Sequence, residues 1–170
     1  DNIDGFIHNE WNLNTKNDDL LTLSLGLRAN YWGYNDEVNI SPRAGIAYKP
    51  SWNKDMLFRL SGGVYVQPPF YRELRMFDGS LISPDKASTQ KSYQVVFTHE
   101  YNFKAWDRPF VLTSEIYYKY LKDIVPYEVD NIRIRYYADQ KATGYATGID
   151  LRINGEFVKG IESWASLSFM

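Results

Sequence analysis

The alternation of apolar and polar residues between Leu20 and Trp32 constrains the fold of this chain most strongly. In LLTLSLGLRANYW, an apolar residue or tyrosine occupies every second position from Leu21 to Tyr31. Successive side chains of a strand point to opposite faces of a sheet, so the run predicts a strand with one apolar and one polar face. A helix would separate Leu21 and Leu23 by about 200° around its axis.

The same period of two recurs along the chain, and turn-rich segments separate its occurrences. A second, shorter alternation at 132–137 predicts a hairpin inside the long connection 122–143, and the other long connection is 68–89. We therefore expect an all-β fold, a long antiparallel up-and-down meander. Its eight strands are predicted at 3–13, 20–32, 39–49, 56–67, 93–104, 110–121, 144–154 and 161–170, joined by turns at 14–19, 33–37, 50–55, 106–108 and 155–160.

Composition narrows the function classes. The 170 residues carry a net charge of −2 and no cysteine, and His8 and His99 are the two histidines. These features argue against a general nucleic-acid binder, a disulfide framework and a cysteine- or histidine-rich metal centre. No apolar stretch is long enough for a transmembrane helix, and no signal peptide is recognisable at the start of the chain. No catalytic constellation is evident, so we expect neither an enzyme nor a cofactor.

Strand length favours a transmembrane barrel over a soluble sandwich. Eleven residues at about 3.3 Å each cover roughly 27 Å along the membrane normal at about 40° of tilt, close to the apolar band of outer-membrane barrels. The aromatic content is 16%, although the mean hydropathy is −0.45. The rings gather at both predicted strand ends, as interfacial girdles require. They are Trp11, Trp52, Trp106, Tyr48, Tyr101, Phe103, Phe110 and Phe157 at the short turns, and Tyr31, Trp32, Tyr118 and Tyr120 at the opposite ends.

The direction of successive strands suggests that residues 1–170 are part of a larger barrel. Such barrels have long loops outside the cell and short turns in the periplasm. Placing the connections 68–89 and 122–143 outside puts both Asp1 and Met170 on the extracellular side, whereas a complete barrel begins and ends in the periplasm. We therefore expect a partial outer-membrane barrel without its plug domain or closing strands.

Two groups of residues are candidates for function. Charged side chains on the polar face would point into the lumen and contact a plug, and the segment Gln67–Phe77 would emerge outside the cell to contact a ligand. The lumen candidates are Arg28, Arg43, Arg59, Glu100, Glu115, Lys119, Asp150 and Arg152. The ligand-binding candidates in the loop are Gln67, Tyr71, Arg72, Glu73 and Arg75.

Four segments resemble the barrel of TonB-dependent outer-membrane receptors, and the large receptors of gut-type Gram-negative bacteria are the most similar group. They are SPRAGIAY (41–48), GGVYVQPPFYREL (62–74), SEIYYKYLKDIVPYEVDN (114–131) and GIDLRINGEFVKGIESWASLSFM (148–170). The resemblance implies a barrel of about 22 strands closed by a plug. It also implies contacts with outer-membrane lipid, with a TonB-type energy-coupling protein through the plug, and with a surface lipoprotein.

Two other interpretations fit the same pattern. One is a soluble β-sandwich that binds carbohydrate through exposed tyrosine and tryptophan, and the other is a small, complete eight-stranded outer-membrane barrel. The environment of the apolar face separates the first alternative from a membrane protein, because a sandwich covers that face with a second sheet.

Overall fold

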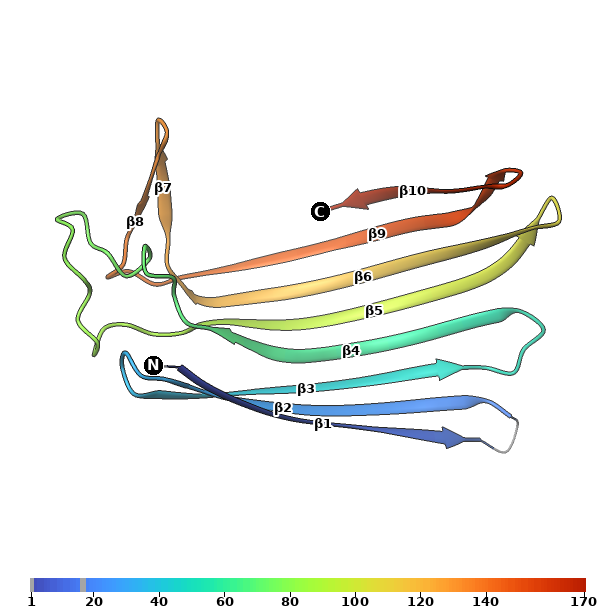
Figure 1. Ribbon diagram of the computed structural model, residues 1–170, viewed down its shortest axis with the longest axis horizontal. Coiled ribbons are helices and arrows are strands. Elements are labelled where there is room, and N and C mark those ends of the chain that lie inside the picture. The colour runs from blue at the N-terminus through green and yellow to red at the C-terminus, as the bar shows by residue number, and fades with distance from the viewer. Residues whose placement is uncertain (1, 16–17) are drawn as a thin grey trace.

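The computed structural model describes residues 2–15 and 18–170, and Figure 1 shows their arrangement. Eight antiparallel strands form one sheet whose spatial order follows the chain, and a separate two-stranded hairpin stands at one end. The sheet contains β1 (Asn2–Asn14), β2 (Leu20–Trp32), β3 (Glu37–Lys49), β4 (Asp55–Gln67), β5 (Gln90–Ala105), β6 (Arg108–Ile124), β9 (Ala142–Val158) and β10 (Ile161–Phe169). The hairpin contains β7 (Tyr127–Asp130) and β8 (Arg133–Tyr136).

This architecture confirms the predicted all-β meander, the eight strands and the hairpin in the second long connection. The observed strands are mostly longer than predicted. Strand β9 continues to Val158, so the turn predicted at 155–160 shrinks to two residues, and β6 continues to Ile124. Near its end β6 has a register shift, with Asp123 at a φ of 56°. Of the turn predicted at 14–19, residues 16 and 17 lie outside the described residues.

The register gives the sheet one apolar face. Residues that pair directly across neighbouring strands lie on the same face, and one such row is apolar on all eight strands. It consists of Trp11, Leu23, Ile46, Leu60, Phe97, Ile116, Ile149 and Phe169. Several members are widely exposed, such as Ile116 at 51% and Phe169 at 61%. The apolar face therefore has no covering layer among the described residues.

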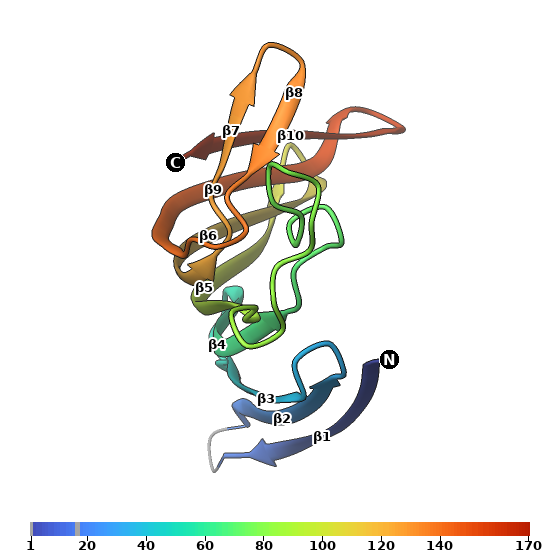
Figure 2. The same ribbon diagram turned by 90° about the vertical axis from the view of Figure 1, so that its left-hand side faces the viewer.

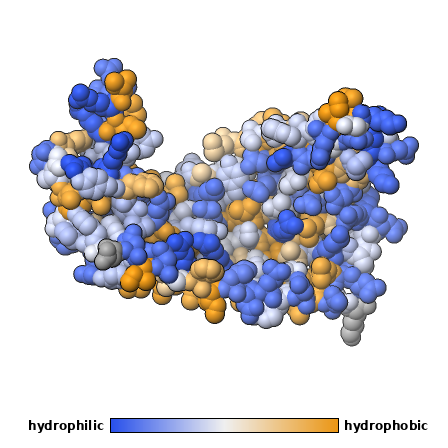
Figure 3. All heavy atoms as spheres, in the orientation of Figure 1, coloured by the Kyte–Doolittle hydropathy of each residue, from blue (hydrophilic) through white to orange (hydrophobic). Residues whose placement is uncertain are grey.

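The opposite face is polar and concave. Figure 2 shows the sheet curving around the 68–89 loop, which lies on its concave side. Residues of this loop pack against Trp32, and Trp32 shares its face with Arg28 and Asn30. The concave face is therefore the polar one. The space-filling view in Figure 3 shows mostly hydrophilic residues at the end with the short turns.

Aromatic side chains of the apolar face gather at both ends of the sheet. At the short turns, Phe103 stacks on Tyr101 and on Phe110, and Trp106 and Phe157 meet Phe110 edge-on. At the loop end, Tyr93 pairs with Tyr120, which pairs in turn with Tyr145. This agrees with the predicted placement of the rings, with one exception.

The exception is Trp32, which was predicted to be one of the girdle rings at this strand end. The register puts Trp32 on the polar face, where it is only 5% exposed. It forms a small core with Leu74, Ile82 and Ala87 of the loop, and stacks on Tyr34 at 5.5 Å. The prediction was wrong because the position of Trp32 at the end of its strand does not reveal that the 68–89 loop folds back over this end of the sheet.

Strands β3 and β4 pair over only part of their length. Their ladder runs from Tyr48–Phe58 to Arg43–Gly63 and stops at Pro42. Proline has no backbone N–H to donate to a ladder, which explains the end of the pairing. At the last pair, an added Cβ on Gly63 would lie 2.9 Å from the carbonyl oxygen of Pro42, so glycine permits the close approach of the two strands.

The ends of the chain lie differently with respect to the loops. Asn2 pairs with Trp32 at the end that carries the long loops, whereas Phe169 pairs with Ile149, partway along β9. Strand β10 therefore runs toward the loop end, in the predicted direction, and stops short of that end. Asp1, predicted at the same end, lies outside the described residues.

Candidate functional site

All eight charged residues predicted for the polar face share the concave face of the sheet. The ladder partners connect them without a break, from Gly26–Arg43 in the first half to Glu115–Asp150 in the second. Six of the eight sheet strands carry these residues, namely β2, β3, β4, β5, β6 and β9. The residues are Arg28, Arg43, Arg59, Glu100, Glu115, Lys119, Asp150 and Arg152.

Ion pairs neutralise part of this surface. Arg28 donates to Asp4 through Nη2 at 2.8 Å and through Nε at 3.0 Å, and Arg59 lies 3.8 Å from Glu100. These side chains are roughly half exposed, except Glu100 at 28%. Exposed pairs of this kind contribute little to stability, typically about 0–1 kcal/mol. They remain accessible to another surface on the concave side.

Three of the cations lie over aromatic rings of the same face. The Arg43 guanidinium carbon is 4.4 Å from the centre of the Tyr65 ring, and Arg152 lies 5.3 Å from that of Trp164. The Lys119 Nζ lies 5.3 Å from the centre of the Tyr117 ring. Such cation–π contacts hold these long side chains along the concave face and leave their charges intact.

Glu115 and Asp150 pair directly across β6 and β9 on the concave face. Like charges that face each other in a sheet are destabilising unless a cation or a hydrogen-bond donor compensates them. Thr98 donates to Glu115 at 3.3 Å, but among the described residues no cationic group lies within ion-pair distance of either carboxylate. This position therefore favours a positively charged partner.

The 68–89 loop is held against the polar face by hydrogen bonds as well as by the small apolar core around Trp32. Thr89 is fully buried, and both its backbone N–H and its hydroxyl donate to Glu37, at 3.2 and 2.9 Å. Asn35 donates to the carbonyl oxygen of Ala87 at 3.0 Å, and Tyr34 to that of Ile82. The loop thus has a defined position over one end of the concave face.

The five loop residues predicted to contact a ligand have different environments. Gln67 ends β4 in the ladder with Gln90. Glu73 accepts from the N–H of Phe70 and from Gln90 Nε2, both at 2.8 Å, so it holds the loop in shape. Arg75 donates to the Tyr71 hydroxyl and to the Gly79 carbonyl oxygen.

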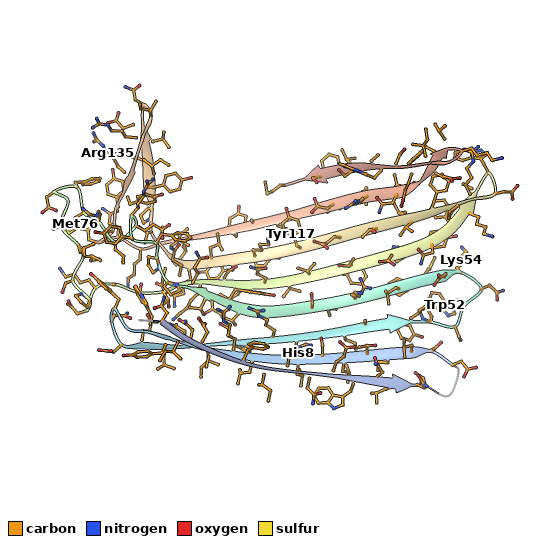
Figure 4. The ribbon with its side chains drawn as sticks, viewed as in Figure 1. His8, Trp52, Lys54, Met76, Tyr117 and Arg135 are labelled. Carbon is orange, nitrogen blue, oxygen red and sulfur yellow. The ribbon has the colours of Figure 1, made fainter. Side chains whose placement is uncertain are left out.

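Two of these residues, Arg72 and Arg75, line a cavity of about 810 Å³ between the loop and the β7–β8 hairpin. We call it the arginine groove. Figure 4 shows Arg135 extending from the hairpin on the side where Met76 lies. The groove is lined by Arg72, Arg75, Met76, Phe77, Ile132, Arg133, Ile134, Arg135 and Tyr136.

Sequence analysis missed the hairpin side of this groove. The alternation Arg133-Ile134-Arg135 was visible and placed both arginines on one face of β8. What the sequence did not reveal is that this hairpin stands beside the 68–89 loop. Phe77 and Tyr137 connect the two segments, with ring centres 5.0 Å apart at 87°. A hydrogen bond to Glu128 raises the pKa of the Tyr137 hydroxyl.

The turns at the opposite end are connected by Asp19. The Ser51 N–H donates to its Oδ1 at 2.7 Å and the Tyr48 hydroxyl to its Oδ2 at 2.9 Å, and both bonds lower the pKa of Asp19. These contacts brace neighbouring turns. They bring no acid–base pair together, and no cluster of metal-binding side chains occurs within residues 2–15 and 18–170.

In comparisons with known proteins, no family model, curated protein or solved structure matches the chain. No described segment forms a helix long and apolar enough to cross a membrane.

Proposed function

We propose that this chain forms part of the wall of a β-barrel in the outer membrane of a Gram-negative bacterium, in a receptor for TonB-dependent ligand uptake. The observation that carries the proposal is the division of the sheet into two faces. An exposed apolar row crosses all eight strands, and eight charged residues lie on the concave side. Lipid is the environment that favours such an apolar face, because a contiguous apolar surface that extends over eight strands is unfavourable in water.

Ring placement and strand length support the same proposal. Seven of the eight sheet strands have 13 to 17 residues, enough to cross the hydrocarbon layer with tilt. Aromatic side chains of the apolar face gather near both ends, where Trp and Tyr favour the membrane–water interface. The resemblance of four segments to receptor barrels supplies the receptor part of the proposal.

In this function the concave face holds a plug domain. Asp150 and Glu115 offer negative charge, and Arg43, Lys119 and Arg152 offer positive charge, so the plug would require complementary groups at these positions. The 68–89 loop and the hairpin lie at the end proposed to face the outside, where a ligand arrives first. No step of this function is catalytic, and it requires no cofactor. A surface lipoprotein would meet the same end.

Detergent dependence tests the membrane part of the proposal. The chain should aggregate in plain buffer and become monodisperse, with a β-sheet circular dichroism spectrum, in dodecyl maltoside micelles, because the apolar face requires an apolar environment. A monodisperse, cooperatively unfolding monomer in plain buffer would instead support the soluble β-sandwich. The adjoining coding sequence distinguishes a receptor segment, which needs a plug domain and further strands, from a small complete barrel.

A further inference from the structure

The arginine groove has a strongly positive lining. Four of its nine lining residues are arginines and none is acidic. Arg135 is paired with Asp130 at 2.7 Å and lies 4.0 Å from Glu128. Within the described part of the chain, no carboxylate oxygen lies within that ion-pair distance of the Arg72 or Arg133 guanidinium. The groove therefore contains two guanidinium groups available to an anion.

Contacts within the 68–89 loop, and between this loop and the hairpin segment, also hold the groove in shape. Arg75 lies 4.7 Å from the centre of the Tyr71 ring, and its Nη1 donates to the Gly79 carbonyl oxygen at 3.1 Å. The Phe77–Tyr137 ring contact joins the loop to the hairpin. Because these groups are already positioned, less conformational entropy is lost when a ligand binds.

The rest of the lining is apolar or aromatic. Phe77 is 62% exposed and Ile132 is 95% exposed, although both lie beside the arginines. A small inorganic anion would leave this apolar surface in water. A ligand that carries an anionic group and an apolar group would cover both parts of the groove.

We propose that the arginine groove binds a phosphate monoester that carries an apolar group. Guanidinium groups bind phosphate oxygens through two parallel hydrogen bonds, and Arg72 and Arg133 have this capacity free. The inference deepens the proposed function, on which it rests, by naming the ligand chemistry at the loop end of the sheet. A soluble phosphate ester and the headgroup of a lipid both have this chemistry.

Binding of 1-naphthyl phosphate to the full chain in dodecyl maltoside micelles tests the inference by fluorescence anisotropy. We expect saturable binding that weakens as salt is added, and much weaker binding of uncharged 1-naphthol. The double variant Arg72→Gln/Arg133→Gln should bind at least about tenfold more weakly, because it removes the charged hydrogen-bond donors that would hold the phosphate oxygens. Among the described residues these two arginines have no carboxylate partner, so the change leaves none of those acidic residues unpaired.

The matched control is Lys54→Gln/Lys159→Gln, which removes the same charge from the short turns at the opposite end. It should bind like the unmodified chain. Equal binding by the arginine variant and the control would overturn the inference, as would equal binding of 1-naphthol. A milder variant, Arg72→Lys, keeps the charge but not the planar fork, and should bind with intermediate affinity.

Phosphatidic acid in the micelles distinguishes the two sources of the phosphate. If it displaces 1-naphthyl phosphate from the unmodified chain and does not bind the arginine variant, the groove accepts a lipid headgroup. If it does not compete, the site is selective for soluble esters. Failure of this inference is separate from failure of the proposed function: a chain that needs micelles to fold yet binds no phosphate ester overturns the inference alone.

Discussion

At the scale of single residues, the sheet depends on glycine where a ring needs space. Phe110 is 2% exposed and pairs directly with Gly155 across β6 and β9. A Cβ on Gly155 would lie 2.3 Å from Phe110 Cδ1, which is inside van der Waals contact. The ring occupies the space above the glycine and packs there against Phe103 and Phe157.

Gly155→Ala should therefore destabilise the sheet by about 1–3 kcal/mol, because the Phe110 ring has to leave its packed position. The measurement is the free energy of unfolding by denaturant in micelles. Gly144→Ala on the same strand is the control, since its Cβ would have no neighbour nearer than 3.8 Å, and it should leave the stability equal or slightly higher. A similar loss for both variants would contradict the role of the Phe110 contact.

At the scale of elements, the 68–89 loop has its own small core on the concave face. Trp32 of β2 supplies the largest side chain of that core, and Leu74, Ile82 and Ala87 come from the loop. The loop therefore docks on the sheet by burying apolar surface as well as through the hydrogen bonds of Thr89. Its placement also fixes one wall of the arginine groove.

Trp32→Ala should release the loop while leaving the sheet assembled. Truncation of a buried tryptophan typically costs about 3–5 kcal/mol, and here the loss falls on the docking of the loop. Trypsin should cut faster after Arg72, Arg75 or Lys86, with an unchanged β-sheet spectrum. The control is Tyr31→Ala, which removes the neighbouring ring from the opposite face. Equal cleavage of the two variants would mean that the core does not hold the loop.

At the scale of the whole molecule, the two faces require different environments. Leu25 lies on the apolar face near the middle of β2 and is 53% exposed, while Ser24 beside it points to the concave side. In the proposed barrel, the first side chain contacts lipid and the second contacts a wet lumen. Neighbouring substitutions can therefore measure the difference between the faces directly.

Leu25→Arg should cost about 2–4 kcal/mol of folding into liposomes, because the charge would lie near the membrane midplane, whereas Ser24→Arg should cost much less. Both free energies can be measured by denaturant titration in the presence of lipid vesicles. Since the two variants add the same side chain to the same strand, they share its propensity and length. Equal costs would refute the assignment of the apolar face to lipid.

Sequence by itself determined the strands, their direction and the membership of each face. This follows from physics that is local: alternation with a period of two decides which side chains share a face, whatever the strand packs against. It correctly placed all eight charged residues together, from Arg28 to Arg152. It also predicts a ligand contact for the loop that carries Arg72 and Arg75, which stays a prediction.

Tertiary structure alone decided what the loops cover. Trp32 is buried because a distant loop folds over it, and Arg72 and Arg133 line one groove because two connections far apart in the chain meet at the same sheet end. The same packing brings Glu73 into hydrogen bonds with the Phe70 N–H and Gln90 Nε2, a structural role that the sequence did not reveal. Such contacts depend on where whole segments dock, and that depends on burial and hydrogen bonding between residues that have no periodic relation in the sequence.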